Sequence, residues 1–154
     1  ACTNLGARYF KGEGVERDPM KAADLYGSAC EGEELNGCAN LGLMHLYGDG
    51  LPRNVEKAMQ LLDRACTLGH FGACNDLARE HFQRGTVHDQ KQAVAYAVRA
   101  CDGKMLDACM NLGLLYANGG VVQKDVDRAQ RLFGVVCESG VEAGCVQQRN
   151  LVAQ

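Results

Sequence analysis

Apolar and small residues recur along the chain at helical spacing, in segments of two alternating kinds. In the first kind they lie at a cysteine and three, four, seven and eight residues after it, as at Cys38, Leu41, Gly42, His45 and Leu46. In the second kind they follow an i, i+3, i+4, i+7 pattern, as at Ala58, Leu61, Leu62 and Ala65. Both patterns place the apolar residues on one stripe of a helix. No segment shows the sustained period-two alternation of a β-strand, so the sequence predicts an all-α fold.

Turn and capping residues separate the two kinds of segment. Each first segment ends at a glycine, the residue favoured where a helix terminates: Gly12, Gly48, Gly85 and Gly119. Each second segment begins at a residue whose side chain can cap a helix N-terminus: Asp18, Asn54, Asp89 and Asp125. These signals predict a chain of antiparallel helix pairs.

The nine cysteines mark a repeat of nearly constant length. Eight of them form four pairs with seven residues between the members: Cys30/Cys38, Cys66/Cys74, Cys101/Cys109 and Cys137/Cys145. The pairs recur every 36, 35 and 36 residues, a period typical of helical solenoids. We therefore expect one α-solenoid domain over residues 1–154. Its repeats are expected at about 2–37, 38–73, 74–108 and 109–144, followed by a partial capping helix at 145–154.

Cys2 fits the same register. It lies 36 residues before Cys38, so we expect the sequence to begin inside a repeat, with a cysteine partner for Cys2 upstream. The alternative is that Ala1 and Cys2 are the remnant of a lipoprotein cleavage site, with Cys2 acylated.

The spacing of the paired cysteines favours four intra-repeat disulfides. The first member lies in the last turn of one helix and the second in the first turn of the next, so a tight connection brings their Cα atoms within bonding distance. Buried free thiols are one alternative. A metal site is another, but the sequence has neither a CxxC nor an HxxxH motif. Disulfides on this scale would imply an oxidising compartment.

Several columns of the repeat together carry a family resemblance. The N-L-G, G-x-G, K-A and A-C columns resemble SEL-one-like repeats, and the regular cysteine pairs resemble the cysteine-rich Helicobacter branch of that family. The resemblance implies a right-handed αα-superhelix, related to tetratricopeptide repeats, in periplasmic or secreted bacterial proteins that serve as interaction scaffolds. A relative in the mitochondrial intermembrane space gives an alternative location. The third repeat departs from the pattern, because Ala78 replaces the helix-packing glycine and Gly85 stands alone.

Composition and motifs exclude several other functions. The net charge of −3 argues against a nucleic-acid binder, which normally carries a basic face. No apolar run is long enough to span a bilayer. Neither Ser28 nor Ser139 begins the S-x-x-K motif of penicillin-recognising serine enzymes. We therefore expect no catalytic residues, no metal and no cofactor.

The face of each first helix opposite its apolar stripe is the candidate binding surface, because stacked helix pairs turn this face into a concave wall. On this face, the position two residues after the cysteine is mostly asparagine, and the other positions vary between repeats. Among these varied residues, Met44 and Tyr47 are expected to be exposed. The candidate partner-binding residues are Asn4, Arg8, Asn40, Met44, Tyr47, Asp76, Glu80, Asn111 and Leu115. For the Asn column, hydrogen bonding to a neighbouring repeat is the alternative role.

The function expected from this surface is a scaffold that binds a protein or peptide partner. Candidate contexts are an immunity or inhibitor protein, an envelope assembly factor and a secreted host-interaction factor. The alternative, which rests on the resemblance alone, is binding of a β-lactam or a peptidoglycan fragment with weak β-lactamase-like activity.

Overall fold

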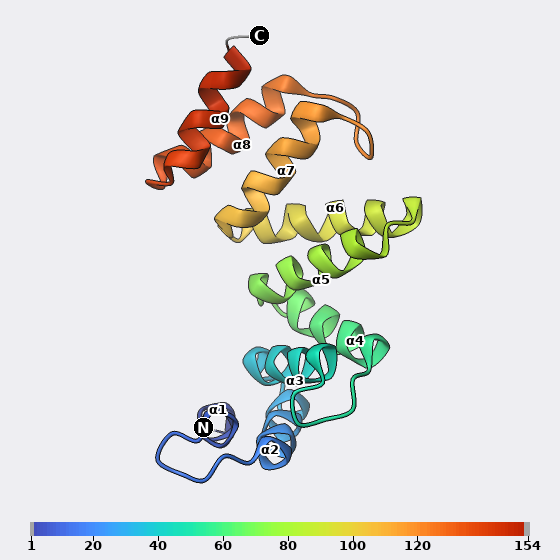
Figure 1. Ribbon diagram of the computed structural model, residues 1–154, viewed down its shortest axis with the longest axis vertical. Helices are drawn as coiled ribbons and strands as arrows, with labels where there is room; N and C mark the ends of the chain where they lie inside the picture. The colour runs from blue at the N-terminus through green and yellow to red at the C-terminus, as the bar shows by residue number, and fades with distance from the viewer. Residues whose placement is uncertain (1, 153–154) are drawn as a thin grey trace. The chain divides into compact units, whose positions relative to one another are not determined.

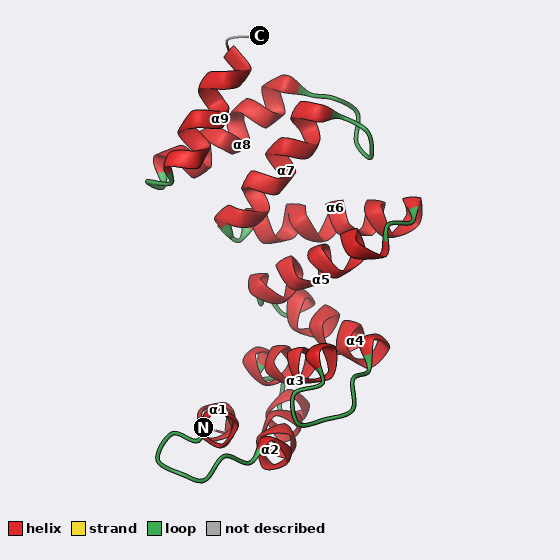
Figure 2. Ribbon diagram, in the orientation of Figure 1, coloured by secondary structure: helices red, strands yellow, loops and turns green. Residues whose placement is uncertain are grey.

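The computed structural model describes residues 2–152, which form nine α-helices and no strand (Figures 1 and 2). The helices are α1 (Cys2–Lys11), α2 (Pro19–Glu31), α3 (Leu35–Tyr47), α4 (Val55–Thr67), α5 (Phe71–Arg84), α6 (Val87–Asp102), α7 (Leu106–Asn118), α8 (Val126–Glu138) and α9 (Glu142–Val152). The expected all-α fold is confirmed. Ala1 and the last two residues of the expected capping helix lie outside the described residues, and α9 begins three residues before the expected start at position 145.

The chain forms two compact units, residues 1–73 and residues 74–154, and the boundary falls within α5. In unit 1, α1 packs on α2, α2 on α3, and α3 on α4. In unit 2, α6 packs on α7, α7 on α8, and α8 on α9. Such nearest-neighbour packing of helix pairs is the architecture of an α-solenoid. We call α1, α3, α5 and α7 the first helices of the repeats, and α2, α4, α6 and α8 the second helices.

Side-chain caps fix where three of the second helices begin. The side chains of Asp18, Asn54 and Asp125 accept hydrogen bonds from backbone N–H groups three residues later, at 3.0, 3.0 and 2.8 Å. The predicted cap at Asp89 is wrong. Helix α6 begins one turn earlier, with Thr86 as its cap, and the Asp89 N–H donates to the Thr86 hydroxyl at 3.1 Å. The third repeat is one residue shorter, so its second helix extends back over the position where the other repeats have a loop.

Small residues let the two helices of each repeat approach closely. A Cβ placed on Gly6 would lie 2.7 Å from the Tyr26 ring, and one on Gly113 would lie 2.6 Å from the Phe133 ring. In the second repeat, a Cβ on Gly42 would lie 2.9 Å from Leu62. Each glycine therefore makes room for one large side chain of the second helix.

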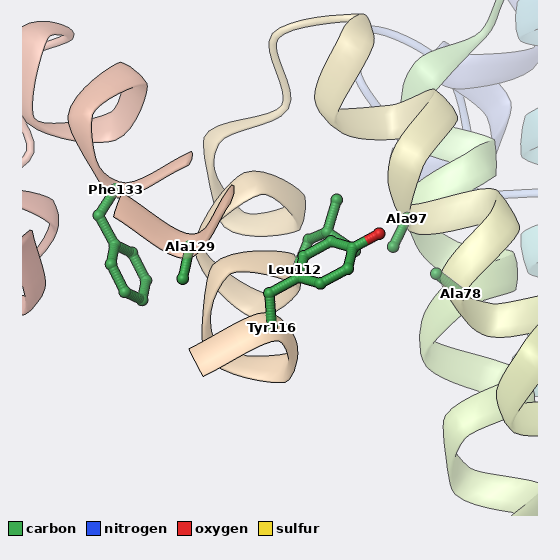
Figure 3. Packing of buried hydrophobic residues seen from close by; sticks show 6 residues of the cluster. All are labelled: Ala78, Ala97, Leu112, Tyr116, Ala129 and Phe133. Atoms are coloured by element: carbon green, nitrogen blue, oxygen red, sulfur yellow. The ribbon is translucent and has the colours of Figure 1, made fainter. Parts of the chain in front are cut away.

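In the third repeat, two alanines stand in place of the glycine and the large side chain. Ala78 stands at the glycine position, and the residue at the position of Tyr26 in the first repeat is Ala97. Both are buried members of one hydrophobic cluster with Leu112, Tyr116, Ala129 and Phe133. Figure 3 shows Ala78 and Ala97 on the facing helices α5 and α6. The small side chain of Ala97 accommodates the extra methyl group of Ala78.

The predicted disulfides are present, and each joins a second helix to the first helix that follows it in the chain. Cys30 bonds to Cys38, Cys101 to Cys109 and Cys137 to Cys145, with Cα–Cα distances of 4.5, 4.7 and 4.6 Å. These distances lie within the range that a disulfide requires. Cys66 and Cys74 are also disulfide-bonded. Cys2 is exposed and is the free cysteine of the described chain.

Candidate binding site

Each unit contains a hollow between two successive first helices, lined in part by residues predicted to bind a partner. The unit 1 hollow lies between α1 and α3, has a volume of about 230 Å³, and is lined by Phe10, Tyr26, Asn40, Leu43, Met44, Tyr47 and Asp49. The side chain of Tyr26 is 3% exposed and comes from α2, which packs on both α1 and α3. Its burial raises the pKa of Tyr26. This hollow is smaller than the pockets that usually hold ligands.

The unit 2 hollow lies between α5 and α7 and has a volume of about 590 Å³, within the usual range of ligand sites. Its apolar lining comes from Ala78, Phe82, Ala97, Ala108 and Met110. Its polar lining comes from Asn75, Arg79, Gln83, Asp107 and Asn111. Apolar side chains with a few polar groups around them are typical of a binding pocket.

Residues at three equivalent positions of the repeat line both hollows, and only the residue from the second helix differs between the two. Phe10 corresponds to Phe82 and Asn40 to Asn111, while Tyr26 corresponds to Ala97. Replacing a phenol by a methyl group removes a ring from the space between the first helices. We attribute the larger volume in unit 2 to this difference.

The structure brings some of the predicted binding residues together. Asn40, Met44 and Tyr47 line the unit 1 hollow, and Asn111 lines the unit 2 hollow. The side chain of Asp76 binds Arg79, a lining residue, with 2.7 Å between the Arg79 Nη2 and Asp76 Oδ1 atoms. The other four predicted residues line neither hollow: Asn4, Arg8, Glu80 and Leu115.

The expected exposure of Met44 is wrong, whereas that of Tyr47 is confirmed. Tyr47 is 57% exposed, but Met44 is only 2% exposed and packs with Ala22, Ala23 and Tyr26 of α2. A first helix inside the stack contacts helices on more than one side, and α3 contacts α1, α2 and α4. Its buried surface is therefore wider than the single stripe that an isolated helix pair would need.

Sequence reasoning missed most of the unit 2 hollow. It did not single out Arg79, Phe82 or Met110, because each belongs to an amphipathic pattern that a packing role explains equally well. The signal in the sequence was one column of the repeat. The third repeat has the small residue Ala97 at the position where the other repeats have the large residues Tyr26, Leu62 and Phe133.

The structure shows the surroundings of the two serines and of the possible metal ligands. Among the described residues, no group of three or more His, Cys, Asp or Glu side chains could hold a metal ion. The Ser28 hydroxyl donates to the Asp24 carbonyl at 3.1 Å, and the Ser139 hydroxyl donates to the Val135 carbonyl at 2.9 Å. Both serines thus bond to their own helix. Within residues 2–152, none of the helices combines the length and the apolar character that crossing a membrane requires.

A family model and several solved structures match the chain. The model of the Sel1 repeat matches residues 1–33, 35–70, 72–104 and 106–140. A Sel1 repeat protein from Oxalobacter formigenes is 27% identical, with a TM-score of 0.83 over 97% of this chain and 60% of that protein. Cysteine-rich protein B of Helicobacter pylori is 30% identical, with a TM-score of 0.62 over 87% of this chain and 97% of that protein.

An immunity protein from Pseudomonas aeruginosa is also similar, at 26% identity and a TM-score of 0.58 over 93% of this chain and 53% of that protein. The chain thus spans only part of the Oxalobacter and Pseudomonas proteins, but nearly all of the Helicobacter protein. No curated protein sequence matches the chain significantly.

Proposed function

Because the chain belongs to the Sel1 repeat family, we propose that it is a non-enzymatic scaffold that binds a protein or peptide partner. The partner would bind at the first helices, at one or both of the two hollows. The observation that carries this proposal is the placement of Asn40, Tyr47 and Asn111 around those hollows. Amide side chains both donate and accept hydrogen bonds, so they can pair with a peptide backbone, and a tyrosine is enriched at interfaces.

The proposal extends to the cellular context. Disulfides persist in oxidising compartments, and the similar Helicobacter protein is itself cysteine-rich. Together these observations support an extracytoplasmic location, which we propose to be the bacterial periplasm or the secreted fraction. The immunity protein among the similar structures makes inhibition of a partner protein one candidate role, beside envelope assembly and host interaction.

The test is capture of a partner by the oxidised chain from periplasmic and secreted fractions of the source cells. We expect one protein to bind in a fixed stoichiometry and to be lost with the variant Asn40→Ala/Tyr47→Ala/Asn111→Ala. The matched control replaces three exposed residues of the second helices, Gln60→Ala/Lys91→Ala/Arg131→Ala, and should keep the partner. Equal retention by both variants would contradict binding on the first helices.

The non-enzymatic part of the proposal has a separate test. The wild-type chain should neither hydrolyse nitrocefin nor become covalently labelled by a penicillin. Turnover by the purified oxidised chain that survives in Ser28→Ala/Ser139→Ala would contradict the proposal and would require a mechanism without a serine nucleophile.

A further inference from the structure

We propose that the unit 2 hollow is a pocket for one bulky, uncharged apolar side chain of the partner, and that Ala97 sets the size of this pocket. The inference rests on the proposed function, because it specifies what part of a peptide or protein partner enters this site. It concerns unit 2 alone, where all of the lining residues lie.

The first argument comes from the other three repeats. At the position of Ala97 they have Tyr26, Leu62 and Phe133, and each of these side chains is at most 3% exposed and lies against a glycine. The chain therefore fills this space with its own large side chain in every repeat but the third. In the third repeat Ala78 and Ala97 face each other (Figure 3), and the space beside them opens into the hollow of about 590 Å³.

The second argument comes from the chemistry of the lining. The buried methyl groups of Ala78 and Ala97 and the half-buried side chains of Phe82 and Met110 form an apolar base. An aromatic or large aliphatic side chain gains free energy by covering such a surface, and a methionine sulfur makes favourable contacts with aromatic rings.

The rim indicates how the rest of the partner would be held. Asn75, Gln83 and Asn111 can donate to and accept from a peptide backbone. The rim also carries one cation, Arg79, and one anion, Asp107, and Arg79 is already paired with Asp76. The Arg79 charge is thus neutralised by Asp76, and Asp107 lies on the rim rather than in the apolar base, so an uncharged apolar side chain is the best match for the base.

The residue pairs of two other repeats show which substitutions would fill the pocket. Ala78→Gly/Ala97→Phe copies the pair Gly113 and Phe133 of the fourth repeat, in which the ring lies against the glycine. Ala78→Gly/Ala97→Leu copies the pair Gly42 and Leu62 of the second repeat and serves if the first variant does not fold. Ala78→Gly alone is the control, because it leaves the pocket open.

The first probe is N-acetyl-phenylalanine amide, compared with N-acetyl-alanine amide, and binding is followed by methyl NMR. With the wild-type chain, the phenylalanine probe should shift the methyl signals of Ala78, Ala97 and Met110. It should bind at least about tenfold more tightly than the alanine probe, as expected for burial of an aromatic ring. The methyl groups of Ala93 and Ala100, buried in α6 outside the lining, should not shift. The Met110 shift should disappear in the filled variants and persist in Ala78→Gly.

The second probe is a random peptide library displayed on phage and selected on the wild-type chain and on a filled variant. We expect the wild-type chain to enrich peptides with Phe, Tyr, Leu or Met at one fixed position, and the filled variant to lose that preference. Peptides enriched with the same preference on both chains would overturn the pocket and leave the proposed function standing. A selective Met110 shift without enrichment of any peptide would support the pocket and contradict the proposed function. An unselective shift, or one that persists in the filled variants, would overturn the pocket.

Discussion

At the residue scale, the combined size of two facing side chains determines how closely the two helices of a repeat can pack. A glycine faces Tyr26, Leu62 or Phe133 in three repeats, and Ala78 faces Ala97 in the other. Protein interiors are close-packed, so adding a single methyl group to a filled contact forces its neighbours to move. The glycines of this column are therefore required by their partners, and the third repeat can dispense with one because its partner is small.

The first prediction follows from this contact. Gly113→Ala should lower the free energy of unfolding by about 1 kcal/mol, because overpacking costs about 1–3 kcal/mol and outweighs the helix propensity gained from alanine. The Phe133 ring that the new Cβ would meet at 2.6 Å is completely buried. Urea denaturation of the oxidised chain measures the change.

The matched control for this prediction is Gly27→Ala. Gly27 also lies inside a helix, α2, but a Cβ there would meet only the Leu41 Cδ2 atom, at 3.9 Å. This variant should gain about 0.5–1 kcal/mol of stability, because alanine restricts the unfolded chain and favours the helix. If both substitutions changed stability in the same direction, the close-packing explanation of the glycine column would be wrong.

At the scale of elements, the start of α6 differs from the starts of the other second helices. The Thr86 hydroxyl donates to the Asp89 carboxylate at 2.6 Å, and the His81 Nδ1 atom lies 3.0 Å from the same carboxylate. The His81 ring also stacks on Tyr96, with 5.5 Å between the ring centroids. These contacts fix the short turn between α5 and α6, and the hydrogen bond from Thr86, followed by that from His81, lowers the pKa of Asp89.

The second prediction concerns the pH dependence of this turn. Since the pKa of Asp89 is lower in the folded chain than its value of about 3.9 in an unfolded one, folding favours the ionised carboxylate. Its contribution to stability should be complete above about pH 5 and should be lost as the pH falls through the folded pKa. Thermal unfolding from pH 7 to pH 2.5 should show wild type melting above Asp89→Asn at neutral pH, with the difference shrinking in acid.

Thr86→Ser provides the control, because it keeps both the cap and the hydroxyl that donates to Asp89. Its acid-dependent loss of stability should match that of wild type. A constant difference between wild type and Asp89→Asn over the whole pH range would show that the carboxylate charge does not stabilise this turn.

The sequence predicts most of the elements, since local signals determine helix ends. The first helices end where expected, at Gly12, Gly48, Gly85 and Gly119, and all four glycines have the positive φ that glycine tolerates best. The failures arise where contacts between repeats decide the outcome. The spacing places Met44 on the polar face of its helix, but the neighbouring helix α2 buries it. Asp89 has a side chain that can cap a helix, but α6 begins earlier because the loop before it is shorter, so Asp89 lies inside the helix. The hollows also depend on packing between repeats, so their sizes required the structure.

At the scale of the whole molecule, disulfides link second helices to the first helices that follow them. The third prediction is a count of thiols. Alkylation of the unfolded but unreduced chain should label one cysteine, Cys2, and alkylation after reduction should label all nine. Intact mass measures both numbers, and peptide mapping identifies the labelled residue. Several labelled cysteines before reduction would mean that the chain matures in a reducing compartment.

The fourth prediction is the loss of stability on reduction. Each disulfide joins residues eight positions apart, and closing a loop of this size stabilises a folded chain by about 2.5 kcal/mol in the chain-entropy model. Cys101→Ser/Cys109→Ser should therefore be about 2.5 kcal/mol less stable than wild type. Four such bonds together contribute about 10 kcal/mol, which is comparable with the whole stability of an ordinary domain.

The reduced chain should consequently lose most of its helical circular dichroism at temperatures where the oxidised chain is folded. Cys2→Ser is the control, because Cys2 forms no disulfide in the chain, and its melting should match that of wild type before and after reduction. Because repeats contact mainly their neighbours, unfolding can begin at any repeat that has lost its disulfide. A reduced chain that melts at the same temperature as the oxidised one would show that packing alone holds the repeats together, and would remove the stability argument for an oxidising compartment.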